Sequence, residues 1–304
     1  MNTLDPAVTM LVLGSALLHA AWNALVKTGG DRLSVMSTIH LTWGVIGGAG
    51  IFLVPWPLSA SWPFILLSVV LHWLYIAGLL TMYREGDLSL VYPLARGSAP
   101  LMLAVLSALW VGEVLTILGW VGVTGVSLGI GVLTLGGRRR AGGDLDEAGA
   151  MAALRKRKAH RRAVWSALFT GMTIVGYTLV DGVGVRRSGS PLGYAAWLFL
   201  LQGGGWGLGW LVWLLLARRP AGGVPLRRRL PTELMAGVMS LAAYGMVIWA
   251  MNLAPLAVVS ALRETGVIFA ALIGTVLLKE PFGRHRIAAA AIVALGVVLL
   301  NWPQ

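Results

Sequence analysis

Two arginines lie inside long apolar runs of the sequence, where a charge is costly. Arg96 lies in the run 88–110, and Arg263 lies in the run 256–278, directly before Glu264. An ionised side chain deep in a membrane span costs roughly 2.5–3.5 kcal/mol on insertion scales, and such residues usually face a bundle interior or a cavity. We expect both arginines to line a cavity and to contact a substrate carboxylate or a gate. The alternatives are that both side chains reach back to the membrane surface, or that Arg263 and Glu264 form structural ion pairs.

A second set of polar and aromatic residues recurs at helical spacing in otherwise apolar runs. His19, Trp22 and Asn23 share one face of the first run, and the third run carries a similar face. Aromatic side chains with sparse polar tips are the usual lining of a small-molecule site. The residues expected to contact substrate are His19, Trp22, Asn23, His72, Tyr75, Tyr92, Arg96, Tyr177, Tyr244 and Arg263, with Glu264 and Asp181 expected in gating or coupling. Interhelical packing or a place at the bilayer interface is expected instead for Trp43, Trp56, Trp62 and Tyr83.

Patterns of metal and nucleophile chemistry are missing from the sequence. Cysteine is absent and no two histidines stand at ligand spacing on one helix, so we expect no metal or other cofactor. A GxSxG match at 125–129 lies inside an apolar run, whereas a nucleophile elbow needs a strand, a turn and a helix. Its glycines, with Gly122, are expected to form a small-residue face for helix packing. Glu113 and Glu280 are expected to fix loops or cap the next helix rather than to carry protons, and the glycine run 203–209 to give a close helix contact or a bend. We therefore expect no enzyme.

The elements that position these residues are apolar runs of the length that crosses a bilayer. Of the 304 residues 57% are hydrophobic and only 12% are charged, which is too few charges to keep a soluble fold of this size wet. A membrane-spanning helix needs roughly 20 apolar residues. Ten such runs occur, at residues 8–26, 34–54, 64–83, 88–110, 116–135, 164–183, 192–215, 233–251, 256–278 and 285–301. The sequence predicts an all-α integral membrane protein with ten transmembrane helices.

The positive charges lie mostly on one side of these runs. Arg186 and Arg187 alone lie in one set of alternating loops, whereas the other set, with the linker 138–163, holds nearly all of the 24 Lys and Arg. By the positive-inside rule this linker is cytoplasmic and both termini face outside. A formal charge of +12 could indicate nucleic acid, but its place in the loops favours a linker attracted to anionic lipid, with a short helix in its Ala-rich middle.

The two halves of the chain resemble each other. A shift of 167 residues places Arg96 on Arg263, and predicts five-helix repeats at 1–137 and 164–304 joined by the linker 138–163. A repeat with an odd number of spans enters the membrane from opposite sides in its two copies. The sequence therefore predicts two inverted five-helix repeats around a central cavity, an architecture frequent in secondary transporters.

These features resemble the drug/metabolite transporter superfamily, in its EamA-type ten-helix branch. The resemblance rests on the stretch PLARGSAP at 93–100, on Glu113 and Glu280 after the fourth and ninth runs, and on the Gly-rich segments 129–132 and 296–299. It implies export of amino acids, aromatic or other neutral ones included, and of related small metabolites across the inner membrane by alternating access. The alternatives are efflux of drugs or cationic compounds in the same superfamily, and an intramembrane enzyme. The expected partners are a small-molecule substrate and the lipid bilayer, without nucleic acid, and we expect a monomer.

Overall fold

The computed structural model describes residues 5–26, 32–85, 88–138, 149–217, 226–276 and 284–302. The helices, in chain order, are α1 (Pro6–Val26), α2 (Arg32–Gly50), η1 (Ser59–Ser61), α3 (Trp62–Glu85), α4 (Leu88–Trp110), α5 (Ile117–Arg138), α6 (Gly149–Arg186), α7 (Pro191–Phe199), η2 (Leu200–Gly204), α8 (Gly205–Ala217), α9 (Leu226–Leu253), α10 (Leu256–Arg263), α11 (Gly266–Val276) and α12 (Arg284–Leu300). A 3-10 turn forms η1, and a π-helical turn forms η2. All regular structure in the described residues is helical, and the prediction of an all-α protein is confirmed.

Each of the ten predicted runs falls on a helix or on consecutive helices. Five helical stretches of the described residues are long and apolar enough to cross a membrane, and three shorter helices are also apolar. The seventh run is divided into α7, η2 and α8, and the ninth into α10 and α11, so neither is the single helix that we predicted. The number of ten crossings stays a prediction.

Helix α6 is much longer than the predicted sixth span. It contains 38 residues and begins at Gly149, within the predicted linker. At 1.5 Å per residue it is about 57 Å long, whereas the hydrocarbon core of a bilayer is about 30 Å thick. The short helix expected in the linker is thus the beginning of α6, which extends well beyond a bilayer.

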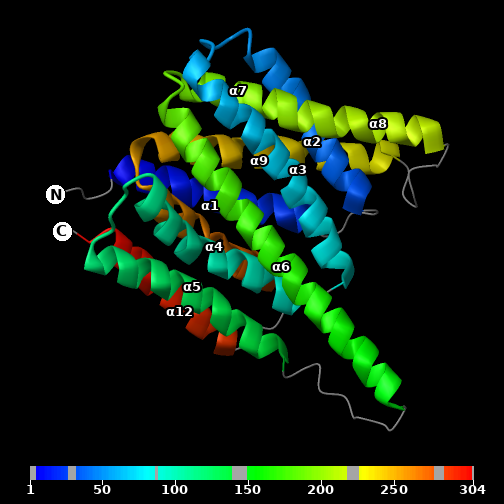
Figure 1. Ribbon diagram of the computed structural model, residues 1–304, viewed down its shortest axis with the longest axis vertical. Coiled ribbons are helices and arrows are strands. Elements are labelled where there is room, and N and C mark those ends of the chain that lie inside the picture. The colour runs from blue at the N-terminus through cyan, green and yellow to red at the C-terminus, as the bar shows by residue number, and fades with distance from the viewer. Residues whose placement is uncertain are drawn as a thin grey trace.

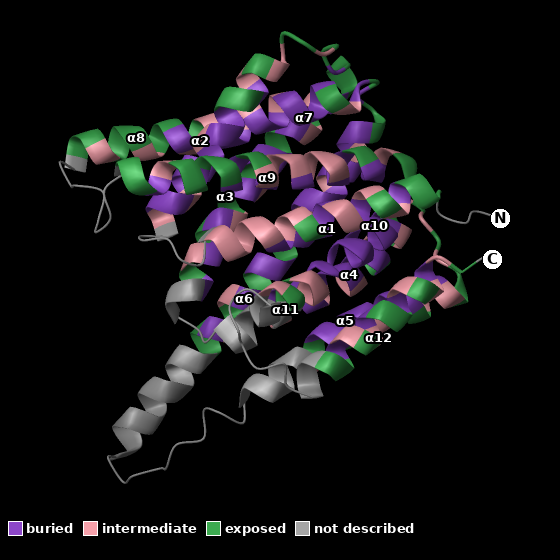
Figure 2. Ribbon diagram, turned by 180° about the vertical axis from the view of Figure 1, so that it is seen from behind, coloured by how far each residue is buried: buried purple, intermediate pink, exposed green. Residues whose placement is uncertain are grey.

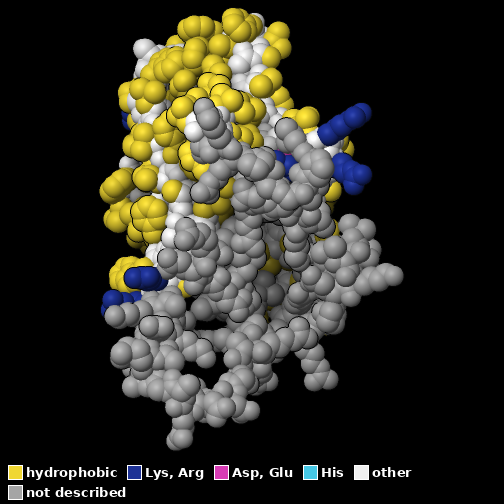
Figure 3. Space-filling model, turned by 90° about the vertical axis from the view of Figure 1, so that its right-hand side faces the viewer, with side chains coloured by type: hydrophobic (Ala, Val, Ile, Leu, Met, Phe, Trp, Pro, Cys, Tyr) yellow, Lys and Arg dark blue, Asp and Glu magenta, His cyan; other side chains and the backbone are white. Residues whose placement is uncertain are grey.

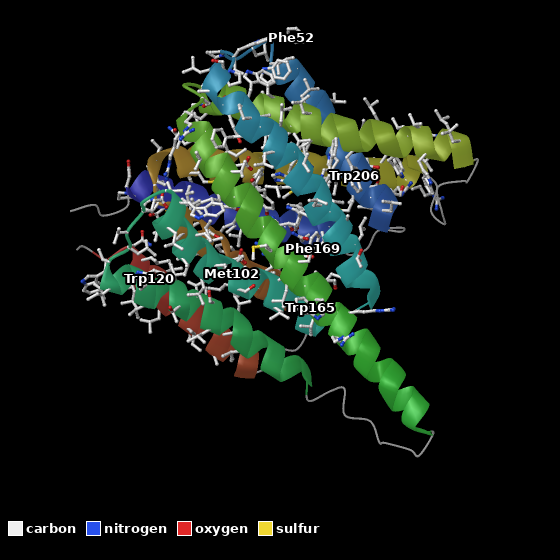
Figure 4. All side chains as sticks on the ribbon, in the orientation of Figure 1. Phe52, Met102, Trp120, Trp165, Phe169 and Trp206 are labelled. Atoms are coloured by element: carbon white, nitrogen blue, oxygen red, sulfur yellow. The ribbon has the colours of Figure 1, made fainter. Side chains whose placement is uncertain are left out.

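The outside of the helical bundle is apolar, as contact with lipid requires. Hydrophobic side chains cover most of the described part of the face in Figure 3, and few Lys or Arg interrupt them. Large apolar side chains such as Phe52, between α2 and α3, and Trp165, on α6, are exposed (Figure 4). A surface of this kind in water would be an aggregation site, so it supports a membrane protein.

Each half packs on the other through corresponding helices, so the contacts between the halves are symmetric. The third helix of each half packs on the first helix of the other, so that α3 lies along α6 and α9 lies along α1 (Figure 1). The last helices, α5 and α12, pair with each other, and α2 packs against α7, η2 and α8. The beginning of α1 and the end of α12 lie together, opposite to the end of α5 and the beginning of α6 (Figure 1). This arrangement agrees with two related five-helix units.

Glycines let α5 and α12 approach closely. A Cβ atom on Gly129 would lie 2.6 Å from Cγ2 of Val293, and one on Gly122 would lie 2.9 Å from the Gly296 carbonyl oxygen. The GxSxG match is therefore part of a small-residue helix contact, as predicted. Ser127 lies within the continuous helix α5, which is not the geometry of a nucleophile elbow.

The two divided runs have different local causes. In the seventh, Gly203 and Gly204 lie so close to the backbone of α2 that no side chain fits at Gly203, which confirms the expected close contact of the glycine run. In the ninth, the helix stops after Arg263, and the Thr265 hydroxyl donates to the Leu262 carbonyl at 2.7 Å before α11 begins at Gly266. The break leaves Glu264 between two short helices.

Candidate functional site

A cavity lies between the two halves, at the helices that exchange partners. Helices α1, α2, α3 and α4 line it from the first half, and α6, α9 and α10 from the second. Its volume is about 90 Å³ for the centres of water-sized molecules, and about 750 Å³ when all empty space, open solvent at the mouth included, is counted. The lining residues are Ser15, His19, Trp22, Met36, Ile39, His40, Trp43, His72, Tyr75, Ile76, Leu79, Arg96, Tyr177, Ser240, Ala243, Tyr244, Val247 and Arg263. The cavity thus has aromatic and aliphatic walls with a few polar groups, as small-molecule sites usually have.

Arg96 is held in the cavity wall by a bidentate ion pair with Glu264. Its Nε donates to Oε2 at 3.0 Å, and its Nη2 lies 2.9 Å from Oε1. Both side chains are buried, and the pair joins α4 to the break between α10 and α11. A buried charge is tolerated when it is paired in this geometry. Of the alternatives for these residues, Glu264 does form an ion pair, but with Arg96 of the other half.

Arg263 has much weaker compensation. Its side chain is 5% exposed, and its Nε lies 4.0 Å from Glu264 Oε1, at the limit of an ion pair. Both Nε and Nη2 are buried and lack a hydrogen-bond partner in the part of the chain that the structure describes. Helix α10, which carries this residue, is buried along its whole length (Figure 2). A buried guanidinium with two unused nitrogens that lines a cavity has the chemistry to bind an anion.

Aromatic rings form a continuous wall opposite these charges. The rings of His72 and Tyr177 stack with centroids 4.1 Å apart, and Tyr177 meets Tyr244 edge-on at 5.9 Å. Trp43 is nearly parallel to Tyr244 at 6.2 Å, and Tyr75 contacts Tyr177 at 5.6 Å. Four helices, α2, α3, α6 and α9, therefore present rings to one apolar space.

Asp181 stands behind this wall and does not line the cavity. The carboxylate is fully buried in α6 and accepts a hydrogen bond from the Tyr194 hydroxyl at 2.8 Å on Oδ1. Its other oxygen accepts one from the Tyr244 hydroxyl. The predicted gating or coupling role of Asp181 would therefore act through Tyr244.

The remaining predicted residues differ in how they face the cavity. Trp22 and His19 both line it, and their rings meet edge-on at 5.3 Å. The indole Nε1 of Trp22 is buried without a hydrogen-bond partner among the described residues. Asn23, by contrast, donates back to the His19 carbonyl at 2.7 Å and does not line the cavity. The side chain of Tyr92 lies outside the described part of the chain.

The sequence reasoning missed the contribution of α2. Met36, Ile39, His40 and Trp43 line the cavity from this helix. Trp43 packs between helices, as expected, with its Nε1 bonded to Ser240 Oγ at 2.8 Å, but it is also part of the cavity wall. The missed signal was the spacing i, i+3, i+4, i+7 of these four residues, which is the spacing of one helix face.

Glu113 connects the end of α6 and the start of α10, and through Arg186 also the end of α9. Its Oε2 accepts a hydrogen bond from the Leu256 backbone N–H, at the start of α10, at 2.8 Å. Its Oε1 lies 2.6 Å from Arg186 Nη2, and Arg186 also donates to the Met251 and Ala254 carbonyls at the end of α9. Glu113 thus caps α10 of the other half, whereas the sequence predicts that it fixes a loop or caps the next helix of the chain. Glu280 lies outside the described residues, and within those residues no cluster of metal ligands occurs.

Comparisons with known proteins agree with this fold. Residues 161–302 match the model of the EamA-like transporter family. The chain is also similar to a solved structure, described only as the crystal structure of a protein, at 16% identity and a TM-score of 0.71, over 97% of this chain and 96% of that one. No curated protein matches the sequence with significance. Residues 161–302, most of the second half of the chain, thus match an EamA-like transporter domain.

Proposed function

We propose that this protein is a secondary transporter that moves amino acids and related small metabolites across the inner membrane through the central cavity. The observation that supports it most directly is the buried guanidinium of Arg263, which lines an aromatic cavity and whose Nε and Nη2 lack hydrogen-bond partners among the described residues. A substrate carboxylate would supply the missing partner. The aromatic walls would receive an apolar side chain.

The proposed roles follow the positions in the cavity. Arg263 would bind the carboxylate, and Arg96 with Glu264 would hold that end of the cavity in shape. Substrate contact is proposed for the other lining residues predicted from the sequence, namely His19, Trp22, His72, Tyr75, Tyr177 and Tyr244. No substrate contact is proposed for Asn23, because its side chain bonds back to its own helix. None is proposed for Tyr92, whose side chain lies outside the described part of the chain.

Alternating access is proposed from the pairing of the halves. Because α1, α3, α6 and α9 exchange partners across the cavity, a small rotation of one half against the other would open one end while it closes the other. The sequence contains no nucleotide-binding motif, so a gradient would drive transport. Export is proposed as the direction because it is what the resemblance to the EamA-type branch of the drug/metabolite transporter superfamily implies.

Efflux of cationic compounds is less well supported. It would need an acid free to bind the cation, yet Glu264 is held by Arg96 and Asp181 by two tyrosine hydroxyls. The charges at the cavity therefore favour an anionic or zwitterionic substrate.

Counterflow in proteoliposomes with a panel of labelled amino acids, with and without a pH gradient, tests the proposal. We expect uptake of some of them, and loss of this uptake in Arg263→Ala while the purified protein keeps its elution profile. If folded wild-type protein moves no amino acid in the panel, the proposed function is wrong. If Arg263→Ala has unchanged kinetics, Arg263 is not part of the site.

A further inference from the structure

The charges around the cavity do not balance, and the repeat explains why. The shift that places Arg96 on Arg263 places Gly97 on Glu264, so the two halves together supply two guanidinium groups and one carboxylate. That carboxylate forms its close contacts with Arg96, at 2.9 and 3.0 Å, and stays 4.0 Å from Arg263. The cavity therefore keeps one guanidinium with little compensation.

A second unused donor lies on the neighbouring helix. The indole N–H of Trp22 is buried without a hydrogen-bond partner in the described residues, and α1, which carries it, packs on α10 and α11. His19, whose ring meets that of Trp22 at 5.3 Å, lines the same cavity as Trp22 and Arg263. Arg263 and Trp22 each offer unused N–H donors to a carboxylate, and a buried donor left without a partner is unfavourable.

The described lining offers no matching charge to an ammonium group. No Asp or Glu is among the described residues that line the cavity. Asp181 is behind Tyr244, and each of its oxygens already accepts a tyrosine hydroxyl. An α-ammonium group that entered this space would lose its water without gaining an ionic partner, and burying an unpaired charge is unfavourable.

We propose that the cavity recognises its substrate by an aromatic body and a carboxylate, and that aryl monocarboxylates without an α-amino group are substrates of the same site. This inference rests on the proposed function, since it assigns the substrate class of that site. The carboxylate binds to Arg263 and the Trp22 N–H, and the ring lies among Trp43, Tyr177 and Tyr244.

Three ligands that share one phenylethyl skeleton test the inference. Phenylalanine has both charged groups, 3-phenylpropanoate lacks the ammonium, and phenethylamine lacks the carboxylate. Binding to purified protein in detergent is measured by titration calorimetry, and each ligand also competes with labelled phenylalanine in counterflow. We expect 3-phenylpropanoate to bind at least as tightly as phenylalanine, and phenethylamine to bind at least about tenfold more weakly than either.

Variants show whether the same groups carry the difference. Arg263→Gln should weaken both carboxylates at least about tenfold and leave phenethylamine within about threefold, whereas Arg263→Lys, which keeps the charge, should retain part of the affinity. Trp22→Phe should weaken the two carboxylates several-fold, to about the extent of one neutral hydrogen bond. Arg187→Gln, at an exposed arginine outside the cavity, is the matched control and should change none of the three affinities.

The inference and the proposed function fail in different ways. If phenylalanine binds and 3-phenylpropanoate neither binds nor competes, an ammonium site exists and the inference is wrong, while amino acid transport stands. Tyr244→Phe would then identify the phenolic oxygen as that site if it removed the preference for phenylalanine. If phenethylamine binds most tightly, both the inference and the carboxylate role of Arg263 are overturned. If none of the three binds to folded protein, the inference is overturned, and counterflow with other amino acids decides the proposed function.

Discussion

Arg96 and Glu264 form an ion pair that makes two buried charges tolerable in the apolar wall of the cavity. The two side chains are 8% and 1% exposed, so removing either one takes from the other the closest counter-charge that the structure shows. We expect Glu264→Gln to lower the free energy of unfolding by about 3–5 kcal/mol, because it leaves Arg96 without its counter-charge. Thermal unfolding of the purified protein in detergent measures the change.

The double variant Arg96→Gln/Glu264→Gln is the control for this prediction. It removes both charges, so its midpoint temperature should lie above that of Glu264→Gln and close to that of the wild type. A double variant that is less stable than the single one would mean that the pair stabilises the fold by more than charge compensation.

At this scale the sequence predicted which residues line the cavity better than how they are paired. The charged, histidine and tyrosine positions stand out because polar groups are rare in apolar runs, and most of them do line the cavity. The partner of Glu264 lies 168 positions away, and the choice between Arg96 and Arg263 depends on how α4 and α10 pack. The spacing of residues along one helix says nothing about contacts between helices. It also does not distinguish a side chain that faces the cavity from one that bonds back to its own helix, as Asn23 does.

At the level of elements, Glu113 fixes the start of α10 from the other half of the protein. Its carboxylate accepts the Leu256 N–H and pairs with Arg186, whose side chain is 29% exposed. Glu113→Gln keeps an acceptor for the N–H, so it should cost at most about 1 kcal/mol, the usual contribution of a partly exposed ion pair. Glu113→Ala should cost about 1 kcal/mol more, because the end of α10 also loses its cap.

Unfolding of both Glu113 variants in detergent checks this order. Equal midpoints for Gln and Ala would show that the hydrogen bond to Leu256 contributes nothing and that the ion pair carries the whole effect. Arg162→Gln, at an exposed arginine of α6 outside the cluster, should behave as the wild type.

The contact between α5 and α12 gives a second prediction about elements. Gly129→Ala places a methyl group 2.6 Å from Val293 Cγ2 and 3.1 Å from the Ala289 carbonyl oxygen, so the helices must separate. We expect a loss of about 1–3 kcal/mol, the usual cost of overpacking. Gly14→Ala in α1 is the matched control, because nothing lies within 4 Å of its new Cβ, and it should stabilise by about 0.5–1 kcal/mol through helix propensity. The prediction is contradicted if the two variants unfold at the same temperature.

The position of every helix was predictable from apolar length, but the interruptions and extensions were not. No proline near Arg263 marks the end of α10 in the sequence. The π-helical turn η2 accompanies glycine contacts with α2, which form only in the folded protein. The extension of α6 into the basic linker escapes a search for apolar runs, although Ala, Arg and Lys are good helix formers.

For the molecule as a whole, the repeat explains where the cavity lies. Helices that exchange partners between the halves surround a space that belongs to neither half, and the small difference between Gly97 and Glu264 makes that space electrically asymmetric. A transporter needs two states of similar free energy, and related halves provide them because each interface has a counterpart at the other end.

The orientation in the membrane is the last property of the whole molecule, and it follows from charge and length together. The beginning of α1 and the end of α12 lie opposite to the beginning of α6. Some basic residues of the linker 138–163 come before α6 in the sequence, and others belong to its first turns. Since α6 is about 57 Å long, its N-terminal part must project from the bilayer on the basic side, which the positive-inside rule assigns to the cytoplasm. Alkaline phosphatase fused after residue 304 should therefore be active, and phosphatase fused within the linker at residue 143 should be inactive. Comparable expression of both fusions, checked by immunoblot, is the control. The opposite activities would place the termini in the cytoplasm and would contradict the proposed orientation.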